Sequence, residues 1–187
     1  ILVAGSHGKP LRALLKHDLI DTFYQEATIV SHYIRRGYRV SWNSVFGQDP
    51  PDLMVADPAK GLFVDVEVKV KFGKATIETM FDSLSRGLGS LKRRGREANK
   101  MAVVTVHNAD DLGWEGWLSD LEVQKRLQSR LSDPAYKIIS GVVFSGGQTI
   151  LNHEDGARQF GTRYVAFRSE TANHPLPYGF LTTGSKI

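Results

Sequence analysis

The sequence predicts an α/β fold in which a central mixed sheet is flanked by helices. Apolar residues recur at three- and four-residue spacing in residues 10–36 and 75–94, which is typical of helices that pack by one face. Apolar and charged residues alternate through residues 62–70, as they do along a strand with one buried face. Residues 100–106 are nearly all apolar, which indicates a central strand covered on both faces.

The elements are expected in the order helix, three strands, helix, strand. Pro10 suits the first turn of the first helix and Gly37 suits its end. A turn at residues 57–61 separates two strands short enough to pair as a hairpin. We predict strands at residues 38–43, 52–56, 62–70 and 100–106, and helices at residues 10–36, 75–94 and 116–131.

Residues 108–187 are expected to extend this core with a helix and a β-hairpin. The hairpin strands are predicted at residues 136–144 and 148–152, because Gly146-Gly147 reads as the turn between them. A further strand is expected at residues 163–168, and the tail beyond it shows turn residues without periodicity.

Length and composition favour one domain spanning residues 1–187. The 187 residues are 41% hydrophobic and 10% aromatic, which is enough for one core. The absence of cysteine excludes disulfides and thiolate metal sites, and the six histidines lack the paired spacing of zinc ligands. No apolar run has bilayer length and the apolar start is too short for a signal sequence. We therefore expect a cytoplasmic protein with no membrane partner.

A charged row on the strand at residues 62–70 is the main functional signal. Asp65, Glu67, Lys69 and Lys71 occupy alternate positions, so they share one face of the strand while valines occupy the other. If the hairpin forms, Asp52 at the start of the neighbouring strand comes close to Glu67. Two carboxylates and an amine would then share one small site. The simpler alternative is a solvent-exposed row of cross-strand ion pairs, which would contribute little stability.

Two adjacent carboxylates repel each other unless a cation neutralises them. Mg²⁺ prefers oxygen ligands and is commonly held by one or two protein carboxylates together with substrate phosphates. Asp52, Glu67 and the peptide carbonyl of Val68 are therefore the expected ligands of Mg²⁺ or Mn²⁺. Lys69 lies on the same face, where it is expected to handle the proton of an attacking water or the charge on a phosphate oxygen.

These residues resemble the signature of the PD-(D/E)xK nuclease superfamily, which has the restriction-endonuclease-like fold. Pro51-Asp52 and Glu67-Val68-Lys69 match its motif, with fourteen residues between the two acids. The resemblance covers about residues 10–107 and implies that Asp52 and Glu67 bind the metal and that Lys69 is the catalytic lysine. It also implies a metal-dependent deoxyribonuclease, for which we expect internal cleavage. No subfamily is assigned.

Members of that superfamily often add an acid from the helix before the first strand, and Glu26 is the candidate here. At about 100° per residue, Glu26 lies about 80° from the centre of the apolar stripe, on its margin. A carboxylate at such a margin needs a partner. Two alternatives are open, namely a role in binding metal or water and a simple ion pair with Arg35, Arg36 or another basic group.

Basic residues are concentrated after the middle of the helix at residues 75–94. The net charge is only +4, from 24 basic and 20 acidic residues, so the distribution is more informative than the total. Phosphate contacts by Lys and Arg supply sequence-independent affinity for nucleic acid, whereas basic residues at a helix C-terminus can also simply complement the helix dipole. The expected phosphate contacts are Lys71, Arg86, Lys92, Arg93, Arg94 and Arg96, with Lys100 at the end of the same stretch.

The leading hypothesis is a Mg²⁺-dependent phosphodiester hydrolase acting on DNA, with RNA as an alternative substrate. The second hypothesis retains the fold without the chemistry, as a catalytically inactive nucleic-acid-binding module or a nuclease subunit. A homodimer, or completion of the site by a fused or partner domain, is compatible with either hypothesis. Strand preference and recognition sequence depend on loops that the sequence does not define.

Overall fold

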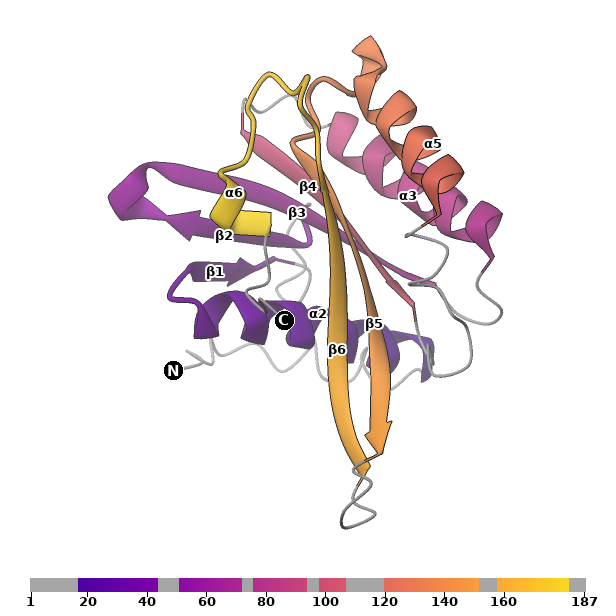
Figure 1. The fold of residues 1–187 in the computed structure, drawn as a ribbon. Coiled ribbons are helices and arrows are strands. Elements are labelled where there is room, and N and C mark those ends of the chain that lie inside the picture. The colour runs from indigo at the N-terminus through magenta and orange to yellow at the C-terminus, as the bar shows by residue number, and fades with distance from the viewer. Residues whose placement is uncertain are drawn as a thin grey trace.

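The structure is a six-stranded mixed sheet covered by helices on both faces (Figure 1). This computed structural model describes residues 17–43, 51–71, 76–93, 98–106, 120–151 and 158–181. The helices are α2 (His17–Arg35), α3 (Ile77–Lys92), α5 (Leu121–Ser132) and the short α6 (Tyr178–Leu181). The strands are β1 (Arg39–Trp42), β2 (Leu53–Asp57), β3 (Leu62–Lys71), β4 (Asn99–Val106), β5 (Gly141–Leu151) and β6 (Arg158–Arg168).

The strands lie in the sheet in their order along the chain, from β1 to β6. Neighbouring strands are antiparallel from β1 to β3, parallel from β3 to β5, and antiparallel again between β5 and β6. Each parallel connection contains a helix, because parallel neighbours need a long crossover. The predicted order of helix, three strands, helix and strand is therefore observed in α2 to β4.

Two apolar clusters hold the layers together, one on each face of the sheet. Alternate residues of β4 enter different clusters: Ala102 and Val104 pack beneath α3 and α5, while Met101 and Val103 pack beneath α2 and α6. All four are at most 1% exposed. The prediction that this strand is central and covered on both faces is confirmed.

The predicted break in the strand at Gly146-Gly147 is wrong. β5 continues through both glycines, with Gly146 opposite Arg163 and Gly147 opposite Thr162 of β6. A glycine pair does not have to turn where a neighbouring strand supplies a partner at each position. β5 also starts later than predicted, because Pro134–Tyr136 forms a 3₁₀ turn in which Asp133 accepts a hydrogen bond from the amide of Ala135 at 2.7 Å.

The ends of several other elements were also predicted imprecisely. α5 begins at Leu121, where Asp120 caps the helix by accepting a hydrogen bond from the amide of Glu122 at 2.8 Å. Residues 10–16 and 116–119, which were predicted to be helical, lie outside the described residues. The tail is more ordered than its sequence indicated, since the ring of Phe180 in α6 is buried and stacks on Tyr33 at 5.0 Å.

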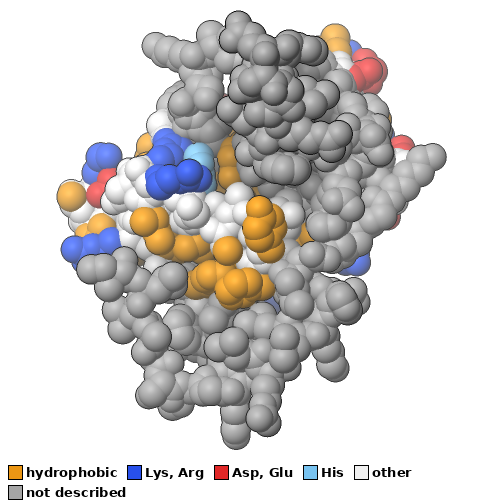
Figure 2. Space-filling view, turned by 90° about the horizontal axis from the view of Figure 1, so that it is seen from below, with side chains coloured by type: hydrophobic (Ala, Val, Ile, Leu, Met, Phe, Trp, Pro, Cys, Tyr) orange, Lys and Arg blue, Asp and Glu red, His pale blue; other side chains and the backbone are white. Residues whose placement is uncertain are grey.

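The outer side of α2 carries apolar side chains that the sheet does not cover. Tyr24 and Ile34 are 65% and 53% exposed. Seen from below, apolar side chains gather on the described surface beside Lys or Arg and a histidine (Figure 2). Within the described residues, no helix combines the length and apolar character needed to cross a membrane.

Candidate active site

The predicted hairpin of β2 and β3 is confirmed, and it places the site. Leu53 pairs with Val66, so the same register carried one residue further sets Asp52 opposite Glu67. The connection is a 3₁₀ turn, Pro58–Lys60, closed by Gly61 in the left-handed region at φ 62°, where a residue without a Cβ avoids strain. Lys60 pairs with Asp57 at 3.0 Å across this turn, at the opposite end of the hairpin from Asp52.

The backbone and side chain of Asp52 are both held in place. The amide of Val68 donates a hydrogen bond to Oδ2 of Asp52 at 2.8 Å, and the amide of Asn43 donates to the Asp52 carbonyl at 2.9 Å. The side-chain amide of Asn43 also donates to the carbonyl of Pro51 at 3.0 Å. The carboxylate is thus fixed beside β3, and it has further lone pairs that can bind a cation.

Glu67 and Lys69 form an ion pair on the face of β3 that carries the charged row. Nζ of Lys69 lies 2.6 Å from Oε1 of Glu67. Glu67 is buried, whereas the Lys69 side chain is 30% exposed. A Cβ built on Gly87 of α3 would lie 3.4 Å from Cγ of Lys69, so the helix packs closely over the lysine stem. The charged row is therefore largely covered by α3, which excludes the simple solvent-exposed row for Glu67 and Lys69.

The pKa of Asp52 shows the cost of bringing these acids together. Burial, followed by the negative charge of Glu67, raises the pKa of Asp52 from 3.8 to about 6, and Glu26 adds a smaller contribution in the same direction. The Val68 amide and the Lys69 ammonium act in the opposite direction. A divalent cation beside Asp52 and Glu67 would remove this repulsion.

The backbone of Val68 offers a third oxygen. The amide of Val68 points toward the edge of β3 where Asp52 lies. In a strand the N–H and C=O of one residue leave on the same edge, so the Val68 carbonyl also faces this edge. Its side chain is buried in the apolar cluster beneath α2, which fixes the orientation of the peptide.

These groups fit a magnesium-type ion better than a metal held entirely by protein side chains. Among the side chains described, no three His, Cys, Asp or Glu residues gather closely enough to hold a metal. Two carboxylates and a carbonyl are nevertheless sufficient for Mg²⁺, which usually retains several waters and shares its coordination with substrate phosphates.

Glu26 is buried at the margin of α2, as its position in the helical pattern indicated, but its partner was not foreseen. Trp42 of β1 donates a hydrogen bond from Nε1 to Oε2 of Glu26 at 2.5 Å. The two arginines proposed as partners donate hydrogen bonds to backbone carbonyls, Arg35 to that of Ser31 and Arg36 to that of Phe180. Because Glu26 raises the pKa of Asp52, it belongs to the electrostatic surroundings of the site.

The residues expected to contact phosphate are only partly brought together. Arg86 and Lys92 are exposed on α3, Arg93 is exposed at the C-cap of that helix, and Lys71 is half-buried on the charged face of β3. Arg94 and Arg96 lie outside the described residues.

Lys100 does not belong to the surface stretch. It is 2% exposed and donates a hydrogen bond from Nζ to the carbonyl of Leu91 at 3.2 Å, near the end of α3. Its inclusion among the surface basic residues is therefore corrected. A buried cation at this place complements the C-terminus of the helix.

Basic residues of α5 were missed by the sequence reasoning. Lys125 and Arg126 are exposed on this helix, and Arg130 is half-buried beside its buried stripe. The signal was present, because Arg126 and Arg130 are four positions apart and such residues are neighbours on a helix surface. Together with Phe81 of α3 they line a groove between the two helices.

Comparisons with models of protein families, with curated proteins and with solved structures found no match to this chain.

Proposed function

We propose that this protein is a Mg²⁺- or Mn²⁺-dependent nuclease that hydrolyses phosphodiester bonds within DNA. The observation that carries the proposal is the position of Asp52 opposite Glu67, with Lys69 2.6 Å from Glu67 on the same face. Two oxygen ligands of this kind beside an amine suit metal-assisted attack on a phosphate.

Each residue has a distinct part in the proposed chemistry. Asp52 and Glu67 would hold the ion together with the carbonyl of Val68, and the amide of Val68 keeps the Asp52 carboxylate oriented. When bound, the ion would supply a more acidic water and a polarised phosphate. Lys69, as an ammonium paired with Glu67, would orient the attacking water or offset negative charge that develops on the phosphate oxygens.

The match of Pro51-Asp52 and Glu67-Val68-Lys69 to the PD-(D/E)xK signature supports the same proposal. The observed order of α2, three strands, α3 and β4 agrees with the core that this resemblance implies. We therefore propose a restriction-endonuclease-like core, to which α5, β5 and β6 add by extending the same sheet.

The test is to incubate the protein with plasmid, linear duplex, single-stranded DNA and RNA, each with Mg²⁺, Mn²⁺ or a chelator. Cleavage of DNA is expected only with metal, and plasmid nicking would show internal cleavage. Asp52→Asn, Glu67→Gln and Lys69→Met should each abolish it. Asp57→Asn and Lys60→Met are matched controls, because this carboxylate and amine pair at the far end of the same hairpin. Equal activity in the site variants and the controls would overturn the proposal.

One observation favours the alternative of a catalytically inactive nucleic-acid-binding module. Lys69 already neutralises Glu67, so the buried carboxylate is balanced without a metal. Calorimetric titration with Mg²⁺ and Mn²⁺ separates the two functions. A nuclease should bind metal in a manner that Asp52→Asn and Glu67→Gln abolish, whereas an inactive module should show no binding that depends on these carboxylates.

A further inference from the structure

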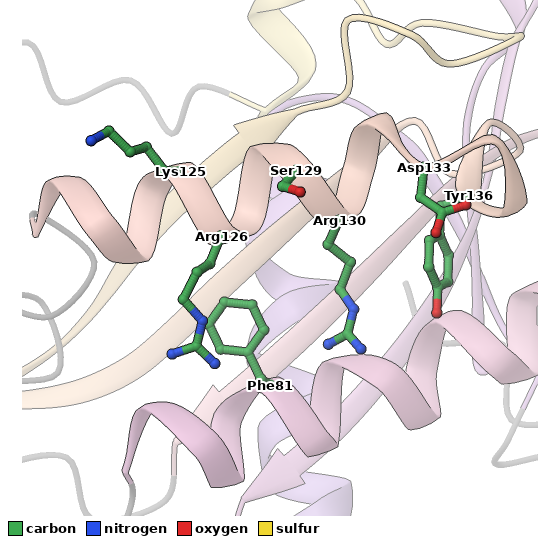
Figure 3. A pocket seen from close by; sticks show the side chains of 7 residues that line it. All are labelled: Phe81, Lys125, Arg126, Ser129, Arg130, Asp133 and Tyr136. Carbon is green, nitrogen blue, oxygen red and sulfur yellow. The ribbon is translucent and has the colours of Figure 1, made fainter.

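A groove of about 600 Å³ separates the outer surfaces of α3 and α5 (Figure 3). Its lining combines three basic side chains with two aromatic rings. The lining residues are Phe81, Lys125, Arg126, Ser129, Arg130, Asp133 and Tyr136.

Two arginines of α5 are held on one aromatic ring of α3. The guanidinium carbons of Arg126 and Arg130 lie 4.7 and 5.9 Å from the centroid of Phe81. Figure 3 shows both side chains reaching from α5 toward this ring, whereas Lys125 points away from it. Stacking on an aromatic ring favours a guanidinium and leaves its N–H edges available for an anion.

The acids near the groove have structural roles of their own. Asp133 accepts the hydrogen bond from the amide of Ala135 and thereby caps the 3₁₀ turn that follows α5. Glu78 lies in the first turn of α3, where it complements the helix dipole, and its contact with Arg126 is long at 3.9 Å. The arginines are therefore not committed to strong ion pairs with these two acids.

We propose that this groove binds backbone phosphates of the nucleic acid on which the protein acts, without reading the bases. This inference rests on the proposed nuclease function and adds a second anchoring surface to it. Phe81 is 7% exposed, and the ring of Tyr136 is approached by the ammonium of Lys92 at 5.3 Å. Both rings thus serve to support cations and are poorly placed to stack on bases, so sequence-independent contacts remain.

A polyanion fits this surface better than an isolated anion or an acidic peptide. Lys92 continues the line of cations from α5 to the C-terminal end of α3, which suits a chain of regularly spaced phosphates. α3 also covers the sheet face that carries Glu67 and Lys69, with Gly87 against the stem of Lys69. α3 thus both lines the groove and covers the charged face of β3.

The test measures binding of a fluorescent 20-bp duplex by anisotropy in chelator, between about 50 and 200 mM salt. The logarithm of the affinity falls linearly with the logarithm of the salt concentration, and each phosphate contact contributes about 0.9 to this salt slope. For Arg126→Gln/Arg130→Gln we expect this slope to fall by about 1.8 and the affinity at 0.15 M salt to fall roughly 30-fold. The loss should be the same for duplexes of different sequence. Arg39→Gln/Lys60→Gln is the control, because it removes two exposed cations near the β2–β3 turn.

Arg126→Lys/Arg130→Lys tests whether the charge or the shape of the guanidinium is responsible for duplex binding. This variant should retain most of the salt slope, and a loss equal to that of the glutamine variant would overturn the proposal. The proposal would also be overturned if the glutamine variant bound the duplex as tightly as the control variant does. Inorganic phosphate and polyglutamate are added as competitors, and the proposal fails if either engages the arginines while the duplex does not.

The outcomes of this test and of the cleavage test are separable. A protein that binds duplex through the arginines yet never cleaves it would refute the nuclease function and retain the groove. A protein that cleaves DNA while the glutamine variant binds as tightly as the control would refute the groove and retain the nuclease.

Discussion

Replacing Asp52 by Asn should stabilise the metal-free protein at pH 8. At that pH Asp52 is ionised in both the folded and the unfolded chain, and its folded pKa is raised from 3.8 to about 6 by burial and by Glu67. A pKa change of this size corresponds to about 3 kcal/mol that the ionised carboxylate costs the folded state. Because Asp52 is only partly buried, we expect Asn to recover about 1 to 3 kcal/mol of unfolding free energy.

The pH dependence has a definite sign. A raised folded pKa means that the native state binds the proton more tightly, so the wild type gains stability from this group as the pH falls from about 6 toward 3.8. The advantage of Asp52→Asn should therefore be largest above pH 7 and shrink below pH 5. Urea denaturation in chelator at a series of pH values measures it, and the Asp57→Asn variant is the control. No stabilisation at pH 8, or an advantage that does not change with pH, would refute the electrostatic reasoning.

Three further variants probe the surroundings of the site and the core. Lys69→Met should slow single-turnover cleavage by on the order of 100-fold or more, which abolishes detectable plasmid nicking, because it removes the amine beside Glu67. Lys69→Arg keeps a cation beside Glu67 and should retain more activity than Lys69→Met, and equal activity of the two variants would contradict this role. Trp42→Phe should lower the free energy of unfolding, measured by urea denaturation, by about 1 to 3 kcal/mol, because buried Glu26 loses its indole donor. An unchanged urea midpoint would contradict the role given to that hydrogen bond. Leu88→Ala should lower the free energy of unfolding by about 2 to 5 kcal/mol in the same assay, because Leu88 is fully buried on the inner face of α3. A loss under about 1 kcal/mol would contradict this packing.

The sequence was most informative where a strand periodicity and a turn signal agreed. The alternation through Val64, Val66 and Val68 assigned the faces of β3, and the short turn after Asp57 fixed the register with β2. Together they placed Asp52 opposite Glu67, and the structure bears this out through the hydrogen bond from Val68 to Asp52. Local rules sufficed because a hairpin pairs residues that are close in sequence.

Predictions that depended on long-range partners were less successful. Gly146 and Gly147 read as a turn, but they pair in a strand because β6 lies beside them. Glu26 accepts a hydrogen bond from Trp42, a contact that depends on the packing of α2 against β1 and that helical spacing alone does not define. Arg126 and Arg130 became a candidate surface only once α5 was placed next to Phe81 of α3.

The most direct test of the metal site is a crystal structure with Mn²⁺, in which anomalous scattering locates the ion. We expect one peak between Asp52 and Glu67, roughly 2.1 Å from a carboxylate oxygen of each and within reach of the Val68 carbonyl. Lys69 should then release Glu67 or share it with the ion. Binding of Mn²⁺ elsewhere, with the Glu67–Lys69 pair unchanged and no density beside Asp52, would contradict the account.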